Sequence, residues 1–127
     1  MTMNEDFVSY ELAVKLKAAG FNEPCYSKWA VEPDGKPFLM GSCLAGFVSS
    51  ECKGRDVLAP FLWQAQKWLR EKHHLSVRVN YIAYHKVWFA DWLNLDSGEF
   101  DDTDATFNTY EEALADGIRF CVENLLK

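Results

Sequence analysis

The apolar positions at the end of the chain recur at helical spacing. In the stretch Asn108–Lys127, large apolar side chains return every three or four residues and form one stripe. Thr109 and Glu112 have the spacing of a capping box, in which the hydroxyl accepts from the amide of Glu112 and the carboxylate reaches back to the amide of Thr109. We therefore predict a helix that covers a sheet with its apolar stripe, which consists of Tyr110, Leu114, Ile118, Cys121 and Leu125.

Two more helices are predicted upstream. The first begins after Ser9, a favourable N-cap, and ends at Gly20, which can adopt the left-handed conformation at a helix end. The second runs from about Pro60 to Lys72, because proline is tolerated in the first turn. Its apolar face consists of Leu58, Phe61, Leu62, Ala65, Trp68 and Leu69, and its opposite face of Trp63, Gln66, Lys67 and Arg70.

A hairpin is predicted between the second and third helices. The segment Leu75–Tyr84 alternates between apolar and polar residues, which is typical of a half-buried strand. After a short turn comes a second strand, Val87–Leu95, which is apolar on both faces. We expect Trp88 and Trp92 to lie under the helices, because the small residue between them leaves room and Asp91 prefers water. The reverse assignment stays open.

A weaker alternation surrounds the turn sequence PDGK at residues 33–36 and predicts another hairpin. The expected order is therefore helix, hairpin, helix, hairpin, helix. We predict the α+β class, with one antiparallel sheet of about four strands covered by helices. A length of 127 residues with 49% hydrophobic positions fits a single domain over residues 1–127.

The cysteines and the N-terminal sequence bear on the setting of the protein. Cys25, Cys43, Cys52 and Cys121 form no C-x-x-C pair, so we expect reduced and mostly buried thiols. The first ten residues, MTMNEDFVSY, lack the basic and apolar regions of a signal peptide. No window approaches the roughly eighteen apolar residues of a membrane span. We expect a cytoplasmic protein that does not contact a membrane.

The net charge of −6 is unevenly distributed along the chain. Residues 53–86 contain seven basic and two acidic groups, whereas residues 87–127 contain two basic and ten acidic groups. The middle of the chain can therefore form a basic face, and the last third is acidic enough to repel a phosphate backbone.

Several segments read together resemble a known family. They are APFLWQAQKWLREKHHLSVRVN, the tryptophan-rich strand and TYEEALADGI. With the SYELAVKLKAAGF helix, they resemble a family of small uncharacterised proteins from Bacteroidetes genomes and their prophages. The resemblance covers most of the chain except roughly Val31–Lys53, and the QKWLRE and TYEEAL segments carry it. It implies a mobile-element origin and a bacterial or phage cytoplasmic setting, and it implies no activity.

The acidic segment Asp96–Asp104 offers the carboxylates that Ca²⁺ or Mg²⁺ prefers. A calcium loop starting at Asp102, however, would have Phe107 where glycine is needed and Ala113 where a glutamate is needed. A solvated turn is the simpler interpretation. The residues that stay as metal candidates are Asp101, Asp102 and Asp104.

Catalysis has no sequence signature in this chain. His73, His74, His85 and Cys52 could serve as bases or a nucleophile, but they show no spacing typical of a Cys, His and carboxylate enzyme. The glycines match no phosphate-binding pattern. We expect a non-catalytic protein without a cofactor.

Binding of another macromolecule fits the remaining features. Aromatic side chains outside the predicted core favour a protein partner or a homo-oligomer, although Trp63 could equally lie over the stem of Lys67 or under the segment 41–56. Nucleic acid is the alternative partner, and an inhibitor that mimics nucleic acid with the acidic C-terminal third is another. The predicted interaction residues are Trp63, Lys67, Arg70, Phe89 and Phe120; the nucleic-acid candidates are Lys67, Arg70, Arg78 and Lys86.

Overall fold

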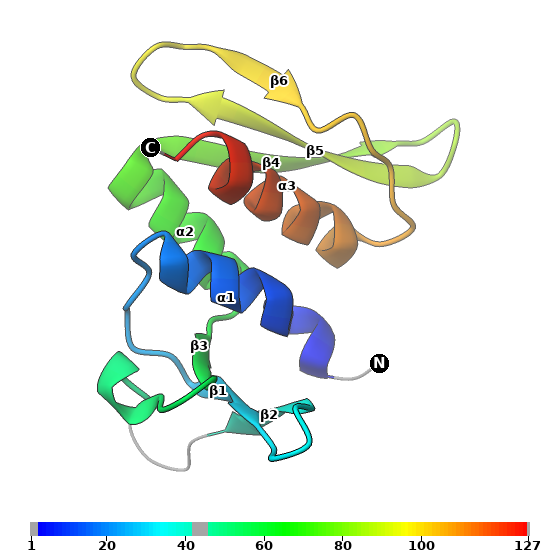
Figure 1. Cartoon of the computed structure of the whole chain (residues 1–127). Helices are drawn as coiled ribbons and strands as arrows, with labels where there is room; N and C mark the ends of the chain where they lie inside the picture. Colours follow the sequence, from blue (N-terminus) through cyan, green and yellow to red (C-terminus); the bar gives the residue numbers. More distant parts are fainter. Residues whose placement is uncertain (1–2, 42–45, 127) are drawn as a thin grey trace. The chain divides into compact units, whose positions relative to one another are not determined.

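The computed structural model describes residues 3–41 and 46–126, and the chain divides into two compact units (Figure 1). The first unit is Met1–Phe61 and the second is Leu62–Lys127. Each unit contains helix and one three-stranded antiparallel sheet, so the α+β class is confirmed. The single domain over residues 1–127 stays a prediction. Cys43 lies outside the described residues.

Helix α1, Tyr10–Ala18, has both of its predicted end signals. The hydroxyl of Ser9 accepts a hydrogen bond from the N–H of Leu12 at 3.2 Å. At the other end Gly20 has a φ of +99°. The N–H groups of Gly20 and of the residue after it bond back to carbonyls of the last turn at 3.0 and 2.9 Å. This double closure is a Schellman motif, which satisfies carbonyls that the helix itself leaves unpaired.

The sheet of the first unit is built around β1. This strand, Ser27–Val31, pairs antiparallel with β2, Pro37–Gly41, on one side and with β3, Val57–Ala59, on the other. The predicted PDGK turn joins β1 to β2: Gly35 has a φ of +89°, and its N–H donates to the carbonyl of Glu32 at 2.8 Å. The turn therefore forms as predicted, and β3 is an additional strand.

The two ends of the first unit meet. The rings of Phe7 and Phe61 stack with their centroids 4.4 Å apart, and the two residues form an isolated β-bridge. The N–H of Val8 donates to the carbonyl of Pro60 at 3.0 Å. Val8 and Leu16 are among the most deeply buried side chains of this unit. The unit's core therefore includes residues from both ends of its sequence.

The second unit is a three-stranded meander with two helices. Its strands lie in the order β4-β5-β6, and both pairs are antiparallel. Helices α2 and α3 lie on one face of this sheet, which we call the helix face (Figure 1). The elements are α2, Leu62–His73; β4, Leu75–Ile82; β5, Val87–Asn94; β6, Phe100–Asp102; and α3, Tyr110–Asn124.

Gly117 allows α3 to approach the sheet closely. A Cβ atom at this position would lie 2.6 Å from Cγ1 of Val77 and 2.8 Å from Cβ of Ala90, closer than real side chains pack. The backbone of α3 therefore lies directly against β4 and β5. The fully buried Ile118 and Cys121 extend this contact along the predicted apolar stripe.

The tryptophans of β5 lie under the helices, as predicted. Trp92 is buried, and its ring stacks on Phe120 of α3 with centroids 6.4 Å apart. Trp88 is half-buried, and its ring meets that of Tyr110 at 5.5 Å. Asp91 faces the opposite side of the sheet, since it alternates with these two residues.

The cap of α3 forms with one difference from the prediction. The hydroxyl of Thr109 accepts from the N–H of Glu112 at 3.1 Å, as expected. The carboxylate of Glu112, however, accepts from that same hydroxyl at 3.0 Å. The two side chains therefore bond to each other at the helix start.

The predicted single sheet of about four strands is not confirmed, because the structure has two separate sheets of three strands. The simple alternation of helices and hairpins is not confirmed either, since a three-residue strand follows each hairpin. Helix α2 begins at Leu62, two residues after Pro60. Leu58 therefore belongs to β3 and Phe61 to the bridge with Phe7, and neither is part of the apolar face of α2.

Candidate functional site

The face of the second sheet opposite α2 and α3 is the most distinctive surface of the second unit, and we call it the outer face. Directly paired residues of antiparallel strands point to the same side, so the register assigns its members. Its apolar residues on β5 are half-buried, and Phe100 is 67% exposed. The outer face consists of Ser76, Arg78, Asn80, Ile82, Val87, Phe89, Asp91, Leu93, Phe100 and Asp102.

A polar group occupies the middle of the outer face. Arg78 Nε donates to Asp91 Oδ1 at 2.8 Å, and Asn80 Nδ2 donates to Asp91 Oδ2 at 3.2 Å. Both oxygens of Asp91 are therefore engaged, and the charge of Arg78 is neutralised by a neighbour on the adjacent strand. The apolar residues of the outer face consequently surround a pair with no net charge.

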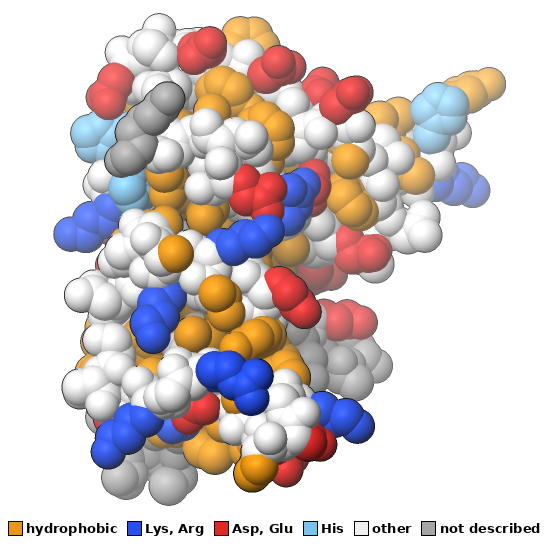
Figure 2. Space-filling model, in the orientation of Figure 1, with side chains coloured by type: hydrophobic (Ala, Val, Ile, Leu, Met, Phe, Trp, Pro, Cys, Tyr) orange, Lys and Arg blue, Asp and Glu red, His pale blue; other side chains and the backbone are white. Residues whose placement is uncertain are grey.

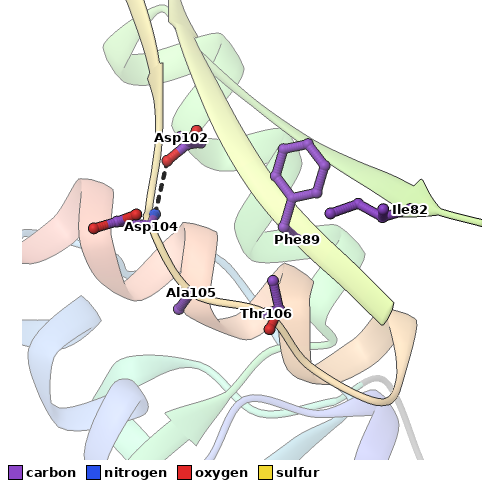
Figure 3. A pocket seen from close by; sticks show the side chains of 6 residues that line it. All are labelled: Ile82, Phe89, Asp102, Asp104, Ala105 and Thr106. Carbon is purple, nitrogen blue, oxygen red and sulfur yellow. Dashed lines mark hydrogen bonds between the residues drawn. The ribbon is translucent and has the colours of Figure 1, made fainter. Parts of the chain in front are cut away.

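A pocket of about 260 Å³ opens beside Phe89 (Figure 3). Phe89 of β5 and Ile82 of β4 form its apolar side, and in this view the Phe89 side chain lies between Ile82 and Asp102. Asp102 ends β6, and the rest of the lining comes from the segment that follows it. The complete lining is Ile82, Phe89, Asp102, Asp104, Ala105 and Thr106.

The acidic side of the pocket is held by local hydrogen bonds. Asp104 has a φ of +62°, a left-handed conformation that aspartate tolerates better than most residues. Its N–H donates to Asp102 Oδ1 at 2.8 Å, whereas its own carboxylate points away from Phe89 (Figure 3). The N–H of Thr103 donates to the carbonyl of Ala90 at 3.1 Å and extends the pairing of β6 with β5.

The three metal candidates do not converge. Asp101 pairs with Trp92 and Asp102 with Asp91, so the two neighbouring carboxylates lie on opposite faces of the sheet. Asp101 Oδ1 also accepts the N–H of Asp102 at 2.8 Å. Within residues 3–41 and 46–126, no group of three or more histidine, cysteine, aspartate or glutamate side chains could hold a metal ion.

The predicted interaction residues lie at three separate places in the second unit. Trp63, Lys67 and Arg70 share the exposed side of α2, where Trp63 is 58% exposed. Phe89 lies on the outer face, on the other side of the sheet from both helices. Phe120 is half-buried against Trp92, so it is less exposed than we expected. The structure therefore does not gather these residues into one surface.

The four nucleic-acid candidates are also divided. Lys67 and Arg70 lie on α2, Arg78 is paired with Asp91 on the outer face, and Lys86 occupies the β4–β5 turn with a φ of +56°. Acidic side chains gather at the top of the view in Figure 2, over β6 and the turn that precedes it. Only α2 brings two of the candidate cations together.

The cysteines and histidines that the structure describes provide no activated pair. Cys25 and Cys121 are buried, and burial raises the pKa of the Cys121 thiol to about 12. Burial also raises the pKa of Cys52, which lowers its thiolate fraction. The pKa of His73 is lowered by burial and by the neighbouring His74. A thiol with a raised pKa is a poor nucleophile at neutral pH.

A hydrogen-bonded network around Asp116 on α3 was not predicted. The side chain of Asp116 is buried. Its Oδ2 accepts from the hydroxyl of Thr103 at 2.6 Å, and its Oδ1 accepts from Arg119 at 2.5 Å. Arg119 also donates to Glu123 at 2.7 Å. The spacing of Asp116, Arg119 and Glu123 could have suggested their pairing, but only β6 supplies the threonine.

Comparison with known proteins adds no family or fold relative. No family model matches the chain, and neither the curated proteins nor the solved structures gave a significant match. In the part of the chain that the structure describes, no helix has both the length and the apolar character that crossing a membrane requires.

Proposed function

We propose that this is a non-catalytic interaction protein of prophage or mobile-element origin, which acts in the bacterial cytoplasm and binds a protein partner through the outer face. The observation that carries the proposal is the set of partly exposed apolar side chains around the neutral Arg78–Asp91 pair. Interfaces typically have an apolar centre with few unpaired charges, surrounded by polar residues.

The pocket beside Phe89 gives this surface its shape. Phe89 and Ile82 provide an apolar side, and Asp102 provides a carboxylate at the other. A partner segment that places an apolar side chain in the pocket and a lysine or arginine beside it would match both. Aromatic residues at the centre of an interface often contribute about 2 kcal/mol or more to binding, so Phe89 is the residue to test first.

The test is affinity capture with the tagged full-length chain from a lysate of a Bacteroidetes bacterium, with and without nuclease. We expect a defined protein that survives nuclease treatment and whose recovery falls about thirtyfold with Phe89→Ala. Phe38→Ala, which truncates an exposed phenylalanine on β2 of the first unit, is the control and should retain the partner. Equal recovery by both variants would contradict the role of the outer face.

Nucleic-acid binding is the second candidate, because α2 places the exposed Trp63 on the same side as Lys67 and Arg70. An aromatic ring beside two cations can stack on a base while the cations contact phosphates. This function predicts salt-sensitive retention on DNA that falls when Lys67 and Arg70 are changed to glutamine. If the captured protein is instead basic and handles nucleic acid, the acidic-inhibitor hypothesis is favoured.

A further inference from the structure

Strand β4 forms one edge of the second sheet, and the hydrogen bonds of β5 reveal which of its backbone groups face outward. The N–H and carbonyl of Trp88 both bond to Phe107, each at 2.8 Å, on the side of β5 away from β4. Backbone direction alternates along a strand, so Val87, Phe89 and Asp91 turn toward β4. The residues of β4 that pair with these three direct their backbone groups toward β5. The backbone groups that point away from β5 belong to the alternate residues Leu75, Val77, Val79 and Tyr81.

A side chain from α2 occupies part of this edge. Gln66 Nε2 donates to the carbonyl of Val77 at 2.9 Å. This bond is independent evidence that the backbone carbonyl of Val77 points away from β5. Among the described residues, β5 is the one strand that pairs with β4. The N–H and carbonyl groups of Val79 and Tyr81 therefore form an edge to which another strand can be added.

Edge strands are commonly protected against such pairing by proline, by unpaired charges or by short length. Strand β4 has eight residues, contains no proline and carries one charged side chain, Arg78. That charge is already neutralised by Asp91. On the helix face of β4, Val77 is buried, whereas Tyr81, four residues further along the strand, is 49% exposed.

We infer that β4 is a dimerisation edge, to which β4 of a second copy of this chain adds antiparallel across a two-fold axis. In the register that avoids Val77, Val79 of each copy lies opposite Tyr81 of the other. Each of these two pairs exchanges both backbone hydrogen bonds. Pairing of a β-branched residue with an aromatic one is favourable between adjacent strands. The result is one continuous six-stranded sheet, to which each copy contributes the three strands of its second sheet.

The charges of the strand fit a second copy. Although the chain carries a net charge of −6, its β4 strand has no unpaired charged side chain. In the proposed register, Asn80 lies opposite Asn80 of the other copy and Arg78 lies opposite Ile82, so no like charges face each other. The two outer faces come to lie on the same side of the joined sheet, because paired residues share a face.

This inference goes beyond the proposed function, because it concerns the edge of the sheet and not its outer face. A monomer could still bind a partner through Phe89, and a dimer could form without any partner. Phe89→Ala should therefore leave self-association unchanged, whereas a change at the β4 edge should remove it. The two proposals can fail separately.

The first test is hydrogen exchange of the purified full-length protein, followed by NMR at several concentrations alongside sedimentation. We expect a dimer, and amides of Val79 and Tyr81 that exchange about tenfold more slowly once it predominates. The amides of Arg78 and Asn80, which bond to β5, serve as internal references. A monomer at every concentration would overturn the inference, and so would edge protection that does not depend on concentration.

Two variants locate the contact. Val79→Pro removes an outward N–H without removing a bond to β5, so a folded but monomeric protein is expected. If that variant does not fold, Asn80→Lys places two ammonium groups opposite each other at the two-fold axis and should give a monomer, with Asn80→Gln as the neutral control. Persistence of the dimer in Asn80→Lys, or its loss in Asn80→Gln, would overturn this register.

Discussion

The sheets of the two units have similar parts but different connections. Each is a hairpin joined by a three-residue strand. In the second unit, β6 follows β5 directly and pairs with it, so every pair joins neighbours in sequence. In the first unit, β3 returns after a long connection and pairs with β1, on the far side of the hairpin from β2. The second sheet is thus assembled from local pairs alone, whereas the first combines a local hairpin with a distant pair.

The two sheets also differ in what holds them together. In the second, Val77, Ala90 and Trp92 are buried beneath the helices. In the first, β2 is mostly exposed along its length, and a partly buried ion pair links the other two strands. Lys28 on β1 lies 3.3 Å from Asp56, which directly precedes β3, and their side chains are only 14% and 20% exposed. Apolar burial therefore contributes to both sheets, since β3 of the first is also buried, and a partly buried polar link is added in the first.

The largest effect is expected for Gly117→Ala. The added methyl group would collide with Val77 and Ala90, and overpacking of this kind typically costs about 1–3 kcal/mol. In an exposed helix the same change would instead stabilise by about 1 kcal/mol. The sign of the change in the free energy of unfolding, measured with urea, therefore tests whether α3 lies as close to the sheet as described. The additional substitution Val77→Ala should recover only part of the lost free energy of unfolding, because the contact with Ala90 remains.

A pair of aspartate substitutions tests the role of the polar link. Asp56 Oδ1 accepts the N–H of Val31 at 2.9 Å in addition to binding Lys28, so Asp56→Ala should lower the free energy of unfolding of the first unit by about 1–3 kcal/mol. Asp91→Ala breaks the more exposed pair with Arg78 and should cost less than about 1 kcal/mol. Equal losses in denaturant unfolding would remove the proposed difference between the sheets.

The helix caps test whether the two units unfold together. Ser9→Ala removes the cap of α1 in the first unit, and Thr109→Ala removes the cap of α3 in the second. Each should cost about 1 kcal/mol. Residue-resolved hydrogen exchange should show faster opening only in the unit that carries the change if the units are independent. Equal acceleration in both units would instead support the single-domain prediction.

The smallest effect is a pH dependence in the second unit. The pKa of His73 is lowered by burial and by His74, and its ring lies 4.8 Å from that of Trp68. Between the lowered pKa and the unfolded value of about 6.5, the unfolded chain binds more protons than the folded one. Stability should therefore rise with pH across this range and fall as the pH drops through it. In His73→Gln, the free energy of unfolding plotted against pH from 5 to 7 should have a shallower slope than in the unsubstituted protein.

Local signals were sufficient to predict most elements of the second unit. The capping residues located the start of α3, and alternation located β4 and β5, because these features depend on neighbours in sequence. Strand β6 was missed because FDD has little intrinsic preference for a strand and forms by pairing with Asp91, Trp92 and Leu93. Strand β3 was missed because Leu58 also fits the helical spacing of α2.

The candidate site was only partly predictable for the same reason. Phe89 could be selected because β5 is apolar on both faces, and alternation separates it from the tryptophans. The pocket beside it depends on the position of Asp102 and of the segment that follows, which the sequence assigned to a solvated turn. The edge formed by Val79 and Tyr81 likewise depends on strand order, which periodicity does not specify.

The joined ends of the first unit have a consequence for synthesis on the ribosome. Because Phe7 stacks on Phe61 and Val8 bonds to Pro60, the unit cannot close until its last residues have left the exit tunnel. Until β3 is translated, the sheet beside helix α1 lacks its third strand. The second unit, whose strands pair in the order in which they emerge, can begin its hairpin early. The nascent chain therefore exposes the core of its first unit until Phe61 has emerged.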